Sequence, residues 1–271
     1  MRLAQLENIQ EDAVENDQVI ASLRKEVREL NNHFSFTAYS SYRQNNSTKN
    51  SIGAPGSLGG VIPSQGGVEV SYRPAVIGLR DRRTFTVFSR LLWSMEPDSF
   101  KVDSETFQAS VGVSYKPFKA QNFYLSAEKL FKVGKNAQNN WLIRGLYGWT
   151  DGFDLNFGQH YWNYTTVFGD VGYFVQSPDI LSFYGEARQG LSYNLGNRLV
   201  LTPHAVIDGR IQTKDKSNVS YLEAGGGLSL KYFFNQTRYQ APRSYVELLF
   251  QYKSGIVNID SGVNATGILR Y

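Results

Sequence analysis

The residues with the clearest potential for chemistry are a histidine and an aspartate on one segment of the chain. His204 and Asp208 fall on the same face of an expected β-strand, four residues apart, which separates them by about 13 Å at ~3.3 Å per residue. They cannot contact each other directly, so a catalytic dyad would need a neighbouring strand to supply a partner such as Glu186 or Glu223. One interpretation is a hydrolase built on His204 and a nearby serine. The other is a polar histidine inside a barrel.

Other reactive groups are scarce. The chain has no cysteine, which excludes disulfides, thiolate metal sites and a cysteine nucleophile. The glycine run 225–227 is followed by neither the lysine nor the helix of a phosphate-binding loop. We therefore expect no catalytic residues, no metal site and no cofactor, and we expect that the protein is not an enzyme.

Charged residues recur in the middle of segments that otherwise alternate apolar and polar residues. In a soluble sandwich they would be solvated on the outer face. In a barrel of twelve strands, with a backbone diameter of roughly 24 Å, they would line a lumen too wide to fill with apolar side chains. The signs are nearly balanced, which favours ion pairs across strands over an ion-selective ring. The expected lumen-lining residues are Arg90, Glu128, Arg144, Asp170, Glu186, Arg188, His204, Asp208, Arg210, Glu223, Lys231 and Glu247.

Twelve segments have the pattern of strands, and each is long enough to cross a bilayer, which takes about 9–11 residues. Strands of soluble proteins average about five or six residues. Aromatic residues make up 14% of the chain, and no apolar run is long enough for a transmembrane helix. The segments are 33–44, 67–76, 83–94, 105–116, 120–131, 140–149, 164–175, 180–193, 198–211, 219–234, 243–253 and 262–271.

The alternation also predicts which side chains face lipid. In 105–116, Val111 and Val113 share the apolar face, and Ser110 lies on the polar one. In 140–149 the apolar face begins and ends with tryptophan, at Trp141 and Trp149, as a strand that crosses two membrane interfaces requires. These features predict an all-β fold: an antiparallel transmembrane β-barrel of about twelve strands with one N-terminal α-helix.

The connections suggest an orientation. If both ends of the chain lie in the periplasm, the odd connections face outward, including 45–66, which is the longest and is rich in Gly and Ser. The second, fourth and eighth connections are tight, as periplasmic turns should be. The sixth (150–163) and the tenth (235–242) are longer than this rule predicts.

The first 32 residues form a separate unit, and residues 33–271 form the barrel domain. Apolar residues recur at steps of three and four, which predicts an amphipathic helix with a seam along one face. The helix has no central apolar run, so it is not a signal peptide. We place it in the periplasm, packed on the barrel or on an upstream domain, with self-association as the alternative. The seam consists of Leu6, Ile9, Ala13, Asn16, Ile20, Leu23, Val27 and Leu30.

Several long stretches resemble a known family, the C-terminal domain of bacteriophage adsorption protein A (NfrA-type). They are VSYRPAVIGLRDRRTFTVFSRLLWS (70–94), VDSETFQASVGVSYKPFKAQN (102–122), RGLYGWTDGFDLNFGQHYWNYTTVFGDVGYF (144–174), YGEARQGLSYN (184–194), LTPHAVIDGRIQT (201–213) and YLEAGGGLSLKYFFN (221–235).

The resemblance implies a bacterial outer-membrane protein that phage use for adsorption, so a phage tail or adsorption protein is an expected partner. It also implies an inner-membrane glycosyltransferase-like subunit as partner, in a system similar to exopolysaccharide secretion. Outer-membrane barrels commonly end on an aromatic residue that the barrel assembly machinery reads, and Leu269 with Tyr271 fits that signal.

We therefore expect an outer-membrane β-barrel pore or receptor that is surrounded by outer-membrane lipid, takes part in polysaccharide export and is used by phage. Basic residues are scattered along the strands without a binding motif, so no nucleic-acid partner is expected. Two alternatives stay open: a soluble β-barrel or sandwich that binds an apolar ligand, and an outer-membrane hydrolase that uses His204.

Overall fold

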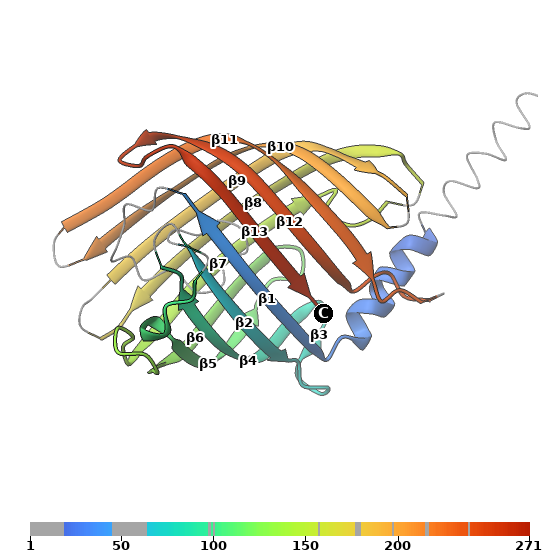
Figure 1. Cartoon of the computed structure of the whole chain (residues 1–271). Coiled ribbons are helices and arrows are strands. Elements are labelled where there is room, and N and C mark those ends of the chain that lie inside the picture. Colours follow the sequence, from blue (N-terminus) through green and yellow to red (C-terminus); the bar gives the residue numbers. More distant parts are fainter. Residues whose placement is uncertain are drawn as a thin grey trace, which may run out of the picture.

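Alternating sequence and long strands produce a closed antiparallel barrel (Figure 1). The computed structural model describes residues 19–44, 64–96, 99, 101–156, 158–176, 180–196, 198–214, 217–237 and 239–271. Within these residues, the wall consists of β1 (Phe34–Arg43), β2 (Gln65–Tyr72), β4 (Arg83–Ser94), β5 (Gln108–Lys116), β6 (Asn122–Lys132), β7 (Asn140–Asp151), β8 (Tyr161–Phe174), β9 (Ile180–Asn194), β10 (Leu199–Lys214), β11 (Ser217–Phe234), β12 (Ser244–Val257) and β13 (Gly262–Arg270).

The sheet closes on itself through its first and last strands. β1 pairs with β2 on one side and with β13 on the other, and β2 also pairs with β4. The two-residue strand β3 (Leu79–Arg80) folds back on β4 through Asp81 and Arg82, both at positive φ, as in a type I′ turn. It does not form a further strand of the barrel wall, so the predicted barrel of twelve strands with one helix is confirmed.

Two predicted strand boundaries were wrong for local reasons. The segment 67–76 ends as a strand at Tyr72, because Pro74 has no N–H for the ladder and disfavours some conformations of the residue before it. The segment 105–116 becomes a strand only at Gln108. Residues Ser104–Thr106 form a 3₁₀ turn instead, in which the Asp103 carboxylate accepts a hydrogen bond from the N–H of Glu105 at 3.0 Å.

The two faces of the wall differ sharply in chemistry. Val111 is 50% exposed on the outside, while its neighbour Ser110 is 1% exposed on the inside. Trp141 and Trp149 also face outward. A closed barrel with an apolar outer wall and a polar interior is the pattern of a transmembrane barrel, and it excludes the two-sheet sandwich that was one alternative.

Successive strands place the connections at opposite ends of the barrel. β1 begins where the N-terminal helix ends, so the connections after β2, β5, β7, β9 and β11, together with the C-terminus, lie at the same end, called here the helix end. The remaining connections lie at the far end. The segment 45–66, expected to face outward, falls mostly outside the described residues, as 45–63 are not among them.

The described part of the N-terminal helix spans 19–31 and lies beside the barrel (Figure 1). The N–H of Ala241 donates to the carbonyl of Arg24 at 3.2 Å, and Arg28 donates to the carbonyl of Pro242 at 3.0 Å. The predicted seam is exposed at Ile20, Leu23 and Leu30. Its members Leu6, Ile9, Ala13 and Asn16 lie outside the described residues. No helix in the described ranges has the length and hydrophobicity to cross a membrane.

Candidate functional site

The inner face of the barrel gathers the charged residues that the sequence singled out. All twelve lie on the inward side of their strands: eleven are buried and the Arg90 side chain is nearly so. These side chains come from β4 (Arg90), β6 (Glu128), β7 (Arg144), β8 (Asp170), β9 (Glu186, Arg188), β10 (His204, Asp208, Arg210), β11 (Glu223, Lys231) and β12 (Glu247).

One ion cluster joins four strands. Glu223 accepts two hydrogen bonds from Arg43, at 2.8 and 2.6 Å, and lies 3.3 Å from Nζ of Lys253. Lys253 also donates to Asp208 at 2.5 Å. All four side chains are buried, and two charges of each sign balance. Arg43 and Lys253 were not among the expected lumen residues, although each lies on the inward side of its strand; the missing information was the register that aligns them with Glu223.

A second cluster forms around Arg90. Its guanidinium donates to Glu69 at 2.5 Å and to Glu128 at 2.9 Å. Glu128 also accepts from the hydroxyl of Ser110 at 2.7 Å. Two further pairs complete the set. Arg144 donates to both carboxylate oxygens of Asp170, and Nε of Arg188 lies 2.7 Å from Glu186. Most of these ion pairs join different strands, whereas Arg188 and Glu186 both lie on β9.

The connection after β7 folds into the barrel at the helix end. Gly152 has φ +67, and a Cβ there would lie 1.9 Å from the carbonyl oxygen of Asn163, so the turn requires glycine. Nε1 of Trp162 donates to the Gly152 carbonyl at 2.8 Å. Leu155 is buried in a cluster with Trp162, Val200, Phe233, Tyr245 and Ile268. This connection, in its described residues 152–156 and 158–160, is called here the plug loop. Its inward fold accounts for a length that was unexpected from the sequence.

A buried lysine lies beneath the plug loop. Nζ of Lys231 sits 3.4 Å from the ring centroid of Phe153, 5.6 Å from that of Tyr245 and 5.9 Å from that of Tyr164. Aromatic faces attract a cation, and more strongly where water is excluded. Lys231 therefore stabilises the inward position of Phe153, and with it the plug loop.

The plug loop is also tied to the N-terminal helix. Asp154 lies 3.3 Å from Nζ of Lys25 and 3.6 Å from Nη1 of Arg28. Burial favours the neutral carboxyl, but the attraction of Arg28 and Lys25 outweighs it, so the pKa of Asp154 lies below its ordinary value. The helix and the plug loop are therefore one electrostatic unit at neutral pH.

The ring of His204 is engaged on both nitrogens. Nδ1 lies 3.0 Å from the carbonyl oxygen of Thr202, and Nε2 lies 2.9 Å from the amide nitrogen of Gln251. Nδ1 therefore donates and Nε2 accepts. In the described part of the chain no serine hydroxyl hydrogen bonds to this ring, and Asp208 pairs with Lys253. The arrangement that a His204 hydrolase needs is not formed.

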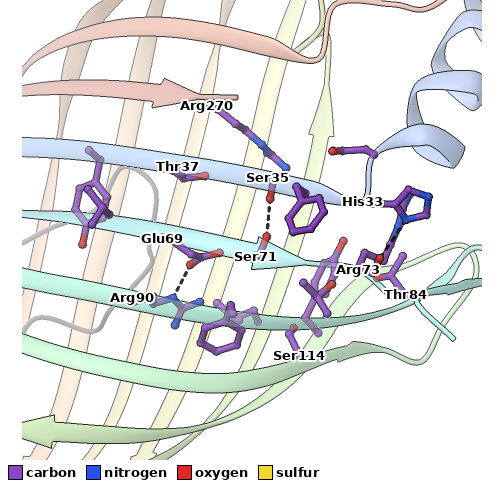
Figure 2. Close-up of a pocket in the computed structure, with 18 of the residues that line it drawn as sticks. His33, Ser35, Thr37, Glu69, Ser71, Arg73, Thr84, Arg90, Ser114 and Arg270 are labelled. Atoms are coloured by element: carbon purple, nitrogen blue, oxygen red, sulfur yellow. Dashed lines mark hydrogen bonds and ion pairs between the residues drawn. The ribbon is translucent and has the colours of Figure 1, made fainter. Parts of the chain in front are cut away.

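A cavity of about 390 Å³ occupies the helix end on the side of β1, β2, β4, β5, β6 and β7. It is called here the vestibule (Figure 2). His33 and Arg73 lie at its outer edge, and the Arg90–Glu69 pair lies at its inner part. Its lining includes the hydroxyl side chains Ser35, Thr37, Ser71, Thr84, Thr86 and Ser114 and the aromatic side chains Tyr39, Phe88 and Tyr124.

The last residue completes the closure of the barrel. Tyr271 exchanges two backbone hydrogen bonds with Phe36 of β1, at 2.8 and 2.9 Å. Its ring and the side chain of Leu269 are exposed on the outside, and the Tyr271 hydroxyl accepts from Arg243 at 3.3 Å. The residues of the expected assembly signal are therefore accessible from the outer surface.

Comparisons with known proteins find one family and several similar solved structures. The family model described as bacteriophage N adsorption protein A C-term matches residues 100–268, more than half of the chain. Three similar solved structures each cover 88% of the chain. LpxR from Salmonella typhimurium has 9% identity, a TM-score of 0.43 and 99% of its own chain covered. The beta domain of the Bordetella autotransporter BrkA has 12% identity, a TM-score of 0.46 and 99% of its own chain covered. OmpTdeltaL8, a loop-deletion mutant of an outer-membrane protein of Vibrio cholerae, has 13% identity, a TM-score of 0.27 and 97% of its own chain covered. No curated protein matches the sequence.

One expectation is corrected by these matches. We expected that the protein is not an enzyme, because no catalytic motif is visible in the sequence. That exclusion is corrected: the lack of a visible motif does not exclude an activity, and LpxR from Salmonella typhimurium is among the matched structures. The likeness concerns the fold and assigns no catalytic residue to this chain.

Proposed function

The chain belongs to the family of the bacteriophage N adsorption protein A C-terminal domain, and it folds as an outer-membrane β-barrel. From this we propose that it is the outer-membrane component of an exopolysaccharide export system and that phage use it as a receptor. The observation that carries the export role is the interior: a polar lumen with paired charges and an unfilled vestibule at the helix end. A lumen with balanced charges suits the passage of a neutral polymer rich in hydroxyl groups better than the selective passage of ions.

The proposal includes an orientation and a set of partners. The helix end faces the periplasm, where the N-terminal helix is available to an inner-membrane glycosyltransferase-like subunit. The far end faces outward, and the segment 45–66 there is the target of a phage tail or adsorption protein. The barrel assembly machinery recognises Leu269 and Tyr271, and outer-membrane lipid surrounds the wall. The twelve inward side chains named above line the export path.

The function is tested in cells by deletion and complementation. Cells that lack the protein should lose both phage adsorption and secreted polysaccharide, the latter measured as total sugar after acid hydrolysis of the medium. The wild-type chain should restore both. A variant in which 45–63, the part of this connection that precedes Ser64 and β2, is replaced by a Gly/Ser linker of equal length should restore export but not adsorption. Secretion that is unchanged in the deletion strain would reject the export role.

The orientation is tested separately with epitope tags. A tag at Asn136 or at Gly56, both in far-end connections of the chain, should be labelled on intact cells. A tag at Lys119, in a helix-end connection, should be labelled only after permeabilisation. The opposite labelling pattern would reverse the barrel and reject the periplasmic position of the helix.

A further inference from the structure

The vestibule differs from the rest of the lumen in how its hydroxyl groups are used. Elsewhere several are bonded to protein, as Ser192 is to Thr202 at 2.9 Å, Ser41 to Thr266 at 2.8 Å, and Ser229 to Glu247 at 2.6 Å. The buried hydroxyl of Ser126 is an exception. In the vestibule, only Ser35 and Ser71 bond to each other, at 2.5 Å.

Four vestibule hydroxyls have their hydrogen-bonding capacity left over. Among the described residues, the side chains of Thr37, Thr84, Thr86 and Ser114 make no hydrogen bond to another protein group, while all four line the cavity. They come from three strands, β1 (Thr37), β4 (Thr84 and Thr86) and β5 (Ser114). Figure 2 shows Thr37, Thr84 and Ser114 around one space. Each hydroxyl can donate one hydrogen bond and accept two. The cavity therefore presents a surface that is ready to bond a hydroxyl-rich molecule.

The charges around this space are mostly engaged by the protein itself. Arg90 is neutralised by Glu69 and Glu128. Arg73 donates to the carbonyl oxygens of Glu29 and Leu30 at the end of the N-terminal helix. A ligand that depended on ion pairing would have to break these contacts, whereas a neutral ligand would not.

The remaining surface suits one class of neutral ligand. Tyr39 and Tyr124 contribute aromatic side chains to the lining, and such rings pack well against the C–H face of a sugar ring. Phe88 also lines the cavity, but it is 3% exposed and its ring lies under Arg90. The volume of about 390 Å³ falls within the range of small-molecule sites, about 300–1,000 Å³. Hydroxyl groups and aromatic faces together match a carbohydrate, which carries hydroxyls at its edges and C–H groups on its faces.

We propose that the vestibule is a binding subsite for a neutral glycan segment that enters the barrel from the helix end. The inference rests on the proposed export function, whose substrate class it names. Binding should be weak, because a path that holds its cargo tightly cannot release it. The subsite would contact the glycan through Thr37, Thr84, Thr86 and Ser114.

Saturation-transfer NMR on the full chain tests this, in a detergent without a sugar headgroup. The probes are neutral tetrasaccharides of glucose (α- and β-linked), mannose and N-acetylglucosamine, with tetragalacturonate as the charged comparison. At least one neutral probe should receive saturation. The isosteric double variant Thr84→Val/Ser114→Ala should weaken its binding about two- to tenfold for each hydroxyl removed. Thr86→Trp, which fills the cavity, should abolish the signal.

A matched control comes from the bonded side of the lumen. Thr202→Val removes a hydroxyl that is already paired with Ser192, and it should leave the signal unchanged. The inference is overturned if no neutral probe binds, if only tetragalacturonate binds, or if the signal survives both vestibule variants in heat-modifiable, folded barrels. These results come from purified protein, so they are distinct from a failure of the export function, which secretion in cells decides.

Discussion

Removing the central carboxylate of the Arg43 cluster should destabilise the barrel strongly. Glu223 is 0% exposed and holds both Arg43 and Lys253. In Glu223→Gln, only Asp208 remains to balance two buried cations. Breaking a buried ion pair by removing one partner costs about 3–5 kcal/mol. The amide oxygen of Gln can still accept one hydrogen bond from Arg43, so we expect a loss of about 3 kcal/mol in the free energy of unfolding.

Urea unfolding in detergent micelles measures this loss. With a slope of about 1–3 kcal/mol per molar urea, the midpoint should fall by about 1–3 M. Glu105→Gln is the matched control, because Glu105 pairs with Lys135 at the surface, where such a pair contributes about 0–1 kcal/mol.

A double variant separates charge imbalance from loss of packing. Arg43→Met/Glu223→Gln removes one charge of each sign and leaves the Lys253–Asp208 pair intact. It should recover most of the lost stability, since replacing both members of a buried pair is often neutral. The reasoning is refuted if Glu223→Gln costs no more than Glu105→Gln, or if the double variant is as unstable as the sum of the single changes.

Three further outcomes are expected. Val111→Arg, on the lipid side, should cost roughly 2–4 kcal/mol and reduce the heat-modifiable fraction, whereas Thr86→Arg, beside the vestibule cavity, should cost far less; equal effects would contradict the assignment of faces. The lowered pKa of Asp154 means that its stabilising contribution is full above the ordinary value of 3.8 and is lost as the pH falls through the lower folded value. A spin label on the N-terminal helix should therefore gain mobility in acid, and Asp154→Asn should show that mobility already at pH 7; a label equally immobile in that variant would rule out the tie to Arg28. Gly152→Ala should cost at least about 1–3 kcal/mol, because the positive φ is strained for alanine and the added Cβ would also collide with the Asn163 carbonyl; an unchanged urea midpoint would argue against the plug-loop geometry.

The strands and their faces could be predicted because each needs only local sequence. Ten or more alternating residues define a strand, and period two then puts Val111 outside and Ser110 inside. The partners of the buried charges could not be predicted in the same way. Arg43 and Glu223 are far apart in the chain, and their contact depends on the register of β1 against β13 and the strands beyond it.

The plug loop and the vestibule were even harder to predict from the sequence. The length of 150–163 was noticed as an exception, and its apolar Phe153 and Leu155 were the available signal for an inward fold. Which half of the lumen is filled depends on where that loop packs. The same charged and hydroxyl residues would line an open pore if the loop pointed away from the barrel.

The uneven strand lengths set an order of events in folding. β10 and β11 are 16 and 18 residues long and adjacent in sequence, so their hairpin can form early with little loss of chain entropy. The barrel closes where β1 pairs with β13. These strands have 10 and 9 residues and come from opposite ends of the chain. This pairing can form only after every intervening strand is in place, and its hydrogen-bonded ladder is the shortest in the wall. We therefore expect the barrel to close last and open first between β1 and β13. For the same reason we expect the β1–β13 pairing to limit the lifetime of the folded barrel, and the backbone of Tyr271 extends this pairing by two hydrogen bonds.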